Sequence, residues 1–362
     1  MVAYNIDMYT IAKIRKNSDD GGKRAAFNKY LSSLAHYFYS FDINCALFLY
    51  LCSANEILSR RMQDKRLRFA IFGNEYQARE SAGVEQVLAC LCDRGAEVCV
   101  DRPFYEYLSH GKHMNVKADG VFDGYNFDAD YAISIGGDGT FLRAANRIMA
   151  KGTPIIGVNT GRLGFLAEVL PGEFGEALDD IYAGRCELEE HTVIQTEADS
   201  RDTAGALPLE GCPYALNDIA ILKRDTASMI TIRTYVNDDF LVTYQADGLV
   251  VSTPTGSTAY NLSNGGPIIV PNSGNICLTP VAPHSLNIRP IVLNDTTVVK
   301  LEVESRSHNF LVAIDGRSEK LHEGTVLIIR KAPCKVKIVK LRSKRYFSIL
   351  REKLMWGADQ RG

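Results

Sequence analysis

A glycine-rich turn contains the residues best suited to chemistry in this sequence. It follows an apolar run that ends at Ile135 and consists of Gly136, Gly137, Asp138, Gly139 and Thr140. Glycine lets a backbone approach a ligand closely, and a helix start offers N–H groups and a positive dipole end to an anion. We therefore expect this turn to hold a phosphate group beside the Asp138 carboxylate. The alternative is a plain strand-to-helix connection with Asp138 as a cap, which explains only one or two of the glycines.

A second polar stretch runs from Asp247 to Pro267. A carboxylate begins an apolar strand, and hydroxyl groups, glycines, Tyr260 and Asn261 then crowd one loop. Hydroxyl and N–H groups suit sugars and phosphates, and an aromatic face can stack on a base. A binding loop is therefore favoured over the alternative, an elaborate turn in a β-domain.

The pair Asn217 and Asp218 interrupts an otherwise apolar strand. An amide beside a carboxylate can bind both hydroxyls of a ribose. A β-bulge or a tight turn explains the pair equally well on local evidence, so both interpretations stay open.

The elements that must position these groups differ between two parts of the chain. Apolar runs at 67–72, 96–100, 131–135 and 153–158 predict strands, patterns at 75–93 and 141–150 predict helices, and 102–127 is a polar loop. This alternation predicts a Rossmann-like α/β domain with a parallel sheet over 62–185, in which ligands bind at the carboxyl ends of strands. The turn at 136–140 lies at such an end. The dinucleotide fingerprint is absent, because Gly73-Asn74-Glu75 follows the first strand.

Residues 186–340 have a different texture. Short β-branched runs recur there, separated by turns such as Asn237-Asp238 and Asp315-Gly316, and no long helical period appears. This predicts an all-β domain, a sandwich of many short strands. The last segment, 341–362, regains a helical pattern with Phe347, Leu350 and Leu354 on one face. We expect it to pack back on the α/β domain.

Composition limits the partners. The chain has 362 residues, 46% of them hydrophobic, and a net charge of −2, so it has no basic field and nucleic acid is not expected as its main partner. Its nine cysteines are scattered without Cys-x-x-Cys spacing, which indicates neither a disulfide framework nor a zinc site but a cytoplasmic protein. The apolar stretch 34–51 contains His36, Asp42 and Asn44, so we expect no membrane span.

Residues 1–61 form an atypical N-terminal extension, because their basic and then aromatic character differs from that of the later residues. Met62 directly precedes the first clear strand, so we expect it to be the true start of the protein. The alternative is a docked amphipathic helix. The intact mass of the native protein decides between them, since a mass that includes 1–61 contradicts a start at Met62.

Four motifs together resemble the NAD kinase family, the ATP:NAD 2′-phosphotransferases. They lie at 136–140, 159–166, 216–218 and 247–263, in the family's order and spacing, and the resemblance covers residues 67–357. It implies an enzyme that transfers the terminal phosphoryl group of ATP to the 2′-hydroxyl of the adenosine ribose of NAD, giving NADP and ADP. It also implies an α/β domain followed by a β-sandwich that binds NAD, with assembly as a homodimer or homotetramer.

The resemblance implies roles for single residues. Asp138 is the implied general base; an unperturbed aspartate has a pKa of about 3.9, so positioning must supply much of the rate. Mg²⁺ or another divalent metal would neutralise the donor phosphates, and no metal ligand is identified. The implied cradle for these phosphates is Gly136, Gly137, Gly139 and Thr140. The implied NAD-binding residues are Asp138, Gly139, Arg143, Asn217, Asp218, Asp247, Thr255, Thr258, Ala259, Tyr260, Asn261, Leu262 and Ser263.

The chain departs from the family's pattern at three places. Gln245 stands where members often have a basic residue, and Ser228 lies near the place where many have histidine or arginine. Arg317 stands where some members have glutamine. Arg317 could contact the phosphates of NAD or those of the donor, and the sequence does not choose between them. Two rival functions remain. A lipid or sugar kinase could share the glycine-rich turn but would lack the 247–263 loop. A silent NAD-binding module would not need Asp138.

Overall fold

The computed structural model describes residues 66–74, 81–161, 164–200, 206–207, 211–225, 228–341 and 345–357. These residues belong to one compact unit, 62–362. The expected N-terminal extension, 1–61, and the candidate start at Met62 lie outside the described residues.

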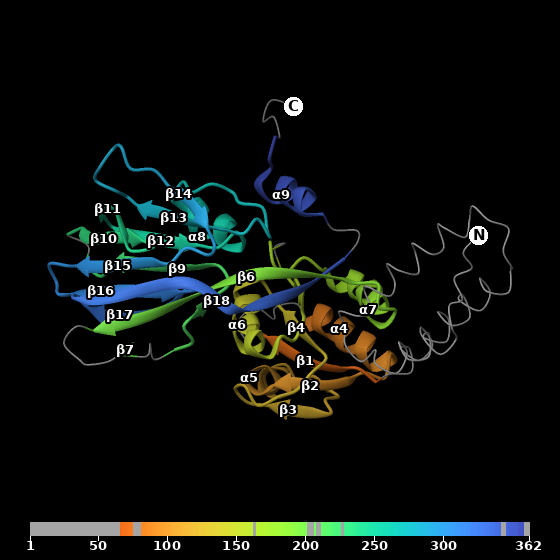
Figure 1. The fold of residues 1–362 in the computed structure, drawn as a ribbon. Helices are drawn as coiled ribbons and strands as arrows, with labels where there is room; N and C mark the ends of the chain where they lie inside the picture. Colours follow the sequence, from red (N-terminus) through yellow and green to blue (C-terminus); the bar gives the residue numbers. More distant parts are fainter. Residues whose placement is uncertain are drawn as a thin grey trace, which may run out of the picture. The chain divides into compact units, whose positions relative to one another are not determined.

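Five parallel strands form one end of the larger sheet, which confirms the expected α/β architecture (Figure 1). They are β1 (Arg68–Gly73), β2 (Glu97–Asp101), β3 (Gly120–Phe122), β4 (Tyr131–Ile135) and β5 (Ile155–Val158), in the order β5-β4-β1-β2-β3. Successive side chains of a strand face opposite sides of a sheet. Accordingly, Phe69 and Ile71 belong to one core cluster while Ala70 and Phe72 belong to another, so both faces of this sheet are buried.

Helices cover the two faces. Apolar residues of α4 (Ser81–Asp93) and α7 (Phe174–Tyr182) pack in the same cluster as Ile71, whereas those of α6 (Asp138–Ile148) pack in the cluster of Phe72. The helix expected at 141–150 begins earlier, at Asp138, because Gly137 takes the extended conformation of an N-cap residue. Asp138 is therefore the first residue of a helix that starts where β4 ends.

The segment 102–127, expected to be a polar loop, is partly ordered. It contains α5 (Arg102–Glu106), the π-helix η1 (Tyr107–Gly111) and β3. Phe104 and Leu108 anchor the two short helices in the core. Elements this short have no long apolar period, which is why the pattern of the sequence does not reveal them. Helix α7 and the one-turn 3₁₀ helices η2 (Met149–Lys151) and η3 (Pro171–Glu173) were not predicted from the sequence either.

Two sheets face one another in the second half of the chain, as the sandwich prediction requires. The strands are β6 (Glu187–Ser200), β7 (Ala206–Leu207), β8 (Tyr214–Ala215), β9 (Asp218–Lys223), β10 (Ile230–Val236), β11 (Asp239–Ala246), β12 (Gly248–Ser252), β13 (Asn275–Val281), β14 (Ile291–Asn294), β15 (Val299–Glu304), β16 (Asn309–Ile314), β17 (Arg317–His322) and β18 (Thr325–Lys340). The smaller sheet has the order β14-β13-β12-β9-β16-β17. Ile219 and Leu249 from this sheet share a core with Ile232 and Leu327 from the larger one.

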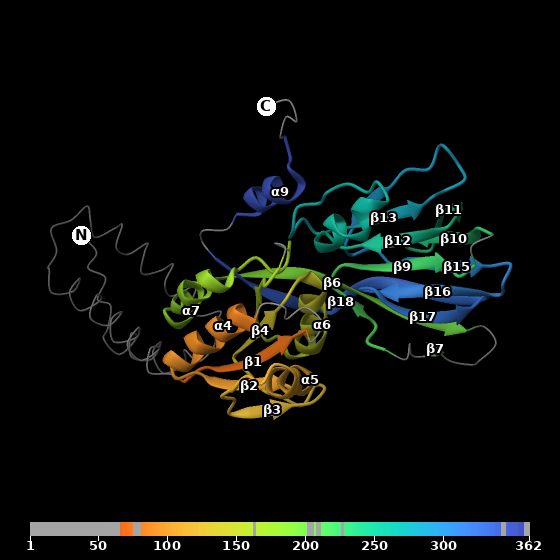
Figure 2. The same cartoon turned by 180° about the vertical axis from the view of Figure 1, so that it is seen from behind.

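The larger sheet continues from β5 through β18, β15 and β10 to β11. Both views show the long strands β6 and β18 running from the β-rich half into the α/β half (Figures 1 and 2). They pair from Thr325↔Ser200 to Lys340↔Glu187, and Ile338 of β18 pairs with Ile155 of β5. A register shift between Lys331 and Lys335 interrupts the pairing of β18 with β6. The domain boundary at 185/186 stays a prediction.

The C-terminal segment returns to the α/β part, as expected. Val339 and Leu341 lie in the core cluster of the parallel strands. In α9 (Tyr346–Leu354), Ile349 and Leu350 are buried, and Lys353 Nζ lies 5.6 Å from the centre of the Phe165 ring. Among the helices of the described residues, none has the length and apolarity needed to cross a membrane.

Candidate active site

The turn between β4 and α6 has a backbone suited to close approach by a ligand. Gly136 has φ = 148°, and a Cβ atom there would lie 2.6 Å from Thr140 Oγ1, so only glycine fits. A Cβ atom at Gly139 would meet nothing within 4 Å. The first N–H groups of a helix have no partner within the helix. Gly136 N–H donates to the Val158 carbonyl at 2.9 Å and Thr140 N–H to the Gly137 carbonyl at 3.0 Å, so the start of α6 offers an anion the N–H of Gly139 and the positive end of the helix dipole.

The Asp138 carboxylate makes contacts that were not predicted from the sequence. Its Oδ2 accepts the N–H of Phe165 at 2.9 Å, and its Oδ1 accepts those of Leu166 and Ala167, each at 3.1 Å. Each carboxylate oxygen can accept two hydrogen bonds, so Oδ2 keeps room for one more donor. Asp138 thus fixes the segment 164–167 and can still accept a hydrogen bond from a hydroxyl group.

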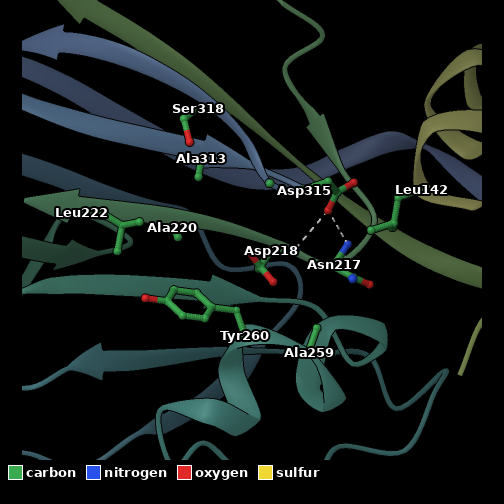
Figure 3. Close-up of a pocket in the computed structure, with 11 residues that line it drawn as sticks. Leu142, Asn217, Asp218, Ala220, Leu222, Ala259, Tyr260, Ala313, Asp315 and Ser318 are labelled. Atoms are coloured by element: carbon green, nitrogen blue, oxygen red, sulfur yellow. Dashed lines mark hydrogen bonds between the residues drawn. The ribbon is translucent and has the colours of Figure 1, made fainter. Parts of the chain in front are cut away.

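Residues from both halves of the chain line one pocket of about 330 Å³ (Figure 3). Its volume falls in the range of small-molecule sites, about 300–1,000 Å³. The pocket is lined by Leu142, Asn217, Asp218, Ala220, Leu222, Ala259, Tyr260, Ala313, Asp315, Gly316 and Ser318. Leu142 comes from α6, four residues after Asp138. Asp138 itself does not line the pocket, but side chains four apart share one face of a helix, so it follows Leu142 along that face of α6.

Asn217 and Asp218 supply two of the polar side chains of this pocket. Both are buried, and Asn217 Oδ1 has no hydrogen-bond partner among the described residues. A buried acceptor without a partner costs free energy, which a ligand that donates a hydrogen bond would recover. Burial, together with the negative charge of Asp315, raises the pKa of Asp218 to about 7. The pair can therefore accept hydrogen bonds from ligand hydroxyl or amino groups.

The predicted binding loop contributes two pocket residues, Ala259 and Tyr260. The loop consists of η4 (Thr255–Thr258) and α8 (Tyr260–Ser263). Tyr260 is 38% exposed, so its ring is open to a ligand. Asn261 is fully buried and holds the loop itself: Nδ2 donates to the Ser257 and Pro267 carbonyls at 3.2 and 3.1 Å, and Oδ1 accepts from Thr279 at 2.5 Å.

The remaining predicted residues do not line the pocket. Thr255 Oγ1 hydrogen-bonds His191 Nδ1 at 2.8 Å, and Asp247 Oδ1 lies 2.6 Å from Lys223 Nζ. Thr258 Oγ1 donates to the Thr255 carbonyl at 3.4 Å. Arg143 is exposed on α6. Leu262 and Ser263 complete α8.

Sequence reasoning missed several walls of the pocket. Four lining residues have small or apolar side chains that do not by themselves indicate a binding site: Ala220, Leu222, Ala313 and Ser318. The sequence did indicate a turn at Asp315-Gly316. Asp315 proves to accept the N–H groups of Leu216, Asn217 and Asp218. A turn pattern predicts a change of chain direction and says nothing about the distant segment that the turn contacts.

The described residues do not form a metal cage. No group of three or more histidine, cysteine, aspartate or glutamate side chains is placed to hold an ion in the described part of the chain. At the glycine-rich turn, Asp138 already accepts three backbone hydrogen bonds. Mg²⁺ usually keeps several waters and binds through one or two carboxylates together with substrate phosphates. This donor set fits a divalent ion that arrives with a phosphate ligand better than an ion resident in the protein.

Both halves of the chain match models of one protein family. Residues 69–186 match the ATP-NAD kinase N-terminal domain, and residues 216–341 match the ATP-NAD kinase C-terminal domain. An NAD kinase of Bacteroides fragilis is 56% identical over 295 residues, which cover 82% of this chain and 100% of that protein. An NAD kinase of Porphyromonas gingivalis is 42% identical over 294 residues, covering 81% and 99%.

Solved structures share the fold. A yeast NADH kinase complexed with NADH superposes with a TM-score of 0.72 at 21% identity, covering 82% of this chain and 90% of that one. An NAD kinase from Archaeoglobus fulgidus in complex with ATP gives a TM-score of 0.62 at 24% identity, covering 80% and 99%. With the family models matched in both halves and relatives this similar along nearly their whole length, the chain belongs to the NAD kinase family.

Proposed function

We propose that this chain phosphorylates NAD: it transfers the terminal phosphoryl group of ATP to the 2′-hydroxyl of the adenosine ribose, giving NADP and ADP. The observation that carries the proposal is the match to ATP-NAD kinase models in both halves of the chain. The pocket supports it, because Leu142 of the Asp138 helix and the Asn217–Asp218 pair line the same space. An acceptor bound to the pair would thus lie beside the glycine-rich turn.

In this proposal the pocket binds NAD. The Asp218 carboxylate and Asn217 Oδ1 accept hydrogen bonds from ribose hydroxyls or the adenine amino group, and Tyr260 offers its ring for stacking. Ala259 lets the ligand approach the backbone of the loop. Gly139, Arg143, Asp247, Thr255, Thr258, Leu262 and Ser263 are proposed to contact parts of NAD beyond this pocket, whereas the buried Asn261 acts by holding the loop.

Asp138 is the proposed base for the transfer. Oδ2, with its remaining acceptor capacity, takes the proton of the 2′-hydroxyl while that oxygen forms a bond to the terminal phosphorus of ATP. The bond between this phosphorus and the bridging oxygen breaks, and ADP leaves with the electron pair. Within the predicted cradle of Gly136, Gly137, Gly139 and Thr140, the N–H groups of Gly136 and Thr140 donate to the Val158 and Gly137 carbonyls and hold the turn, while the N–H of Gly139 and the positive end of the α6 dipole stabilise the phosphoryl oxygens. A divalent ion bound to the ATP phosphates would supply further positive charge.

An assay that crosses NAD and NADH with ATP and polyphosphate tests the proposal. NADP formation from NAD, ATP and Mg²⁺ is the expected result. Diacylglycerol, sphingosine and fructose 6-phosphate serve as acceptors for the rival kinases. Phosphorylation of one of these, with no NADP formed from NAD, would contradict the proposal.

We expect Tyr260→Ala to raise KM for NAD more than it lowers kcat. Stacking on a base is worth about 1–3 kcal/mol, which corresponds to roughly a 5- to 150-fold change in KM. This contact is made in the ground state and in the transition state alike, so its loss leaves kcat largely unchanged. Steady-state kinetics with varied NAD measure both constants. An unchanged KM would exclude contact between Tyr260 and NAD.

We expect kcat/KM for NAD to fall as the pH drops through about 7. The pKa of Asp218 is raised to about 7 by burial and by Asp315, so the carboxylate is ionised above this pH and protonated below it. Only the ionised form accepts charge-assisted hydrogen bonds from two hydroxyl groups. A pH profile of kcat/KM reports groups of the free enzyme. In Asp218→Asn, kcat/KM should no longer fall as the pH drops through about 7. If it still falls in this variant, another group causes the fall.

The same group makes a prediction for stability. The pKa of Asp218 is higher in the folded protein than the usual value of about 3.9, so the folded state holds this proton more tightly than the unfolded state. The free energy of unfolding therefore falls as the pH rises from about 4 to about 7, by up to about 1.4 kcal/mol per pH unit, and it levels off above pH 7. Denaturant unfolding at pH 6 and pH 8 should show a smaller loss for Asp218→Asn. An equal loss in both proteins would contradict the assignment.

A further inference from the structure

The segment 211–218, which ends at the Asn217–Asp218 pair, is held by the β16–β17 turn. Asp315 Oδ2 accepts the N–H of Leu216 at 2.8 Å, and Oδ1 accepts those of Asn217 at 2.7 Å and Asp218 at 3.2 Å. The N–H of Asp315 in turn donates to the Asp218 carbonyl at 3.0 Å. Figure 3 shows Asp315 beside the pair, at the edge of the pocket. One side chain therefore fixes three successive peptide groups.

Strand β17 holds the earlier part of the same segment. Arg317 Nη2 donates to the carbonyls of Cys212 and Tyr214, each at 3.2 Å. Glu319 Oε1 accepts the N–H of Gly211 at 3.0 Å. Successive odd-numbered residues of β17 face this segment, because side chains alternate between the two faces of a strand. The contacts of Asp315, Arg317 and Glu319 together form what we call the 315–319 clamp.

The backbone of the turn explains why an acidic residue can stand at its tip. Ile314 pairs with Arg317, so Asp315 and Gly316 form a two-residue hairpin loop, and their φ values are +47° and +81°. Two-residue loops with positive φ at both positions favour Asn-Gly and Asp-Gly. Asparagine would therefore make the turn equally well. Its amide has one acceptor oxygen and an NH₂ group, so it cannot accept all three N–H groups.

We propose that Asp315 and Arg317 are positioning residues for NAD binding, which hold the Asn217–Asp218 pair in its binding geometry. The inference rests on the proposed function, because it assumes that this pair contacts NAD. It also gives Arg317 a role. The sequence left open whether Arg317 contacts the phosphates of NAD or those of the donor. Arg317 acts on the backbone that leads to the pair, through the Cys212 and Tyr214 carbonyls.

Asp315→Asn tests the clamp, because it keeps the turn and removes acceptors. We expect KM for NAD to rise at least tenfold, with KM for ATP and kcat within threefold of wild type. The acid limb of kcat/KM for NAD should move to lower pH. The negative charge of Asp315, which lies beside Arg317, raises the pKa of Asp218, so removing this charge lowers that pKa. A general loss of folded protein would lower the active fraction and leave both KM values and this limb in place.

Arg317 provides a second test that does not depend on the stability of Asp315→Asn. Arg317→Met removes both carbonyl contacts and should raise KM for NAD alone, by roughly 3- to 10-fold. Arg317→Gln keeps one donor and should recover part of this effect. Arg306→Met, at an exposed arginine in the turn before β16, is the matched control and should leave KM unchanged.

Two results would overturn the proposed role of the clamp. One is an equal change in the KM values for NAD and ATP, and the other is an unchanged KM for NAD in both Asp315→Asn and Arg317→Met. A rise in KM for ATP alone on Arg317→Met would instead assign Arg317 to the donor phosphates. Wild-type protein is measured in the same assay. If it makes no NADP, the proposed function fails, whereas an active wild type with unaffected variants rejects only the clamp.

Discussion

Asp138→Asn is expected to lower kcat by about 10²- to 10⁴-fold, the contribution typical of a general base. The amide cannot take the proton of the 2′-hydroxyl. It also cannot accept all three N–H groups of Phe165, Leu166 and Ala167, which the carboxylate binds in the structure. KM for NAD should change far less, because Asn217, Asp218 and Tyr260 remain in place. Rapid-quench and steady-state assays of NADP formation measure the effect.

Asp93→Asn is the control for this variant, because Asp93 is an exposed carboxylate at the end of α4. It should keep the wild-type kcat. Direct titration with NAD then separates binding from chemistry: Asp138→Asn should bind NAD with near wild-type affinity. A kcat within threefold of wild type for Asp138→Asn would remove Asp138 from the reaction.

Gly164→Ala should be nearly as damaging, although residue 164 is not a proposed ligand. A Cβ atom at this position would lie 1.8 Å from Asp138 Oδ1, so the alanine and the carboxylate cannot both keep their places. Displacing a reacting group by about 1 Å can cost about 10² in rate. We expect a loss of kcat of this size with KM for ATP within a few-fold of wild type.

Gly161→Ala is the matched control from the same loop. The nearest atom to its added Cβ, Asn159 Oδ1, lies 4.0 Å away, an ordinary contact distance. This variant should retain full activity. If Gly164→Ala were as active as Gly161→Ala, the Asp138 carboxylate would not need the position that the structure gives it.

The parallel strands β1, β2, β4 and β5 could be predicted because they are largely apolar, as strands between two helical layers must be, whereas the three-residue β3 fell within an expected loop. Strands β14 and β17 could not, because each lies at an edge of the smaller sheet with alternate residues exposed. In β17 these positions carry charged and polar groups, which read as a loop in a single sequence. β13 contains Pro280, a residue that argues against a central strand, yet the strand lies between β12 and β14.

For the candidate site, the residues within short motifs could be predicted from the sequence, but their contacts with distant segments could not. Local patterns sufficed to select Asn217, Asp218 and Tyr260, the family resemblance added Ala259, and the structure brings these four to one pocket. The contacts that hold them are distant in sequence. Asp315 binds N–H groups 97 to 99 residues away, and Asp138 binds those 27 to 29 residues away. A short motif contains the chemical group but not the segment that the group will meet.

The central claim, that the phosphoryl group of ATP reaches the 2′-hydroxyl of NAD, can be tested most directly by ³¹P NMR of the wild-type reaction. With NAD, ATP and Mg²⁺, we expect a 2′-phosphate monoester resonance that grows in step with ADP, and that does not grow with Asp138→Asn. ADP accompanied by inorganic phosphate alone, or a phosphate on any other hydroxyl of NAD, would contradict it.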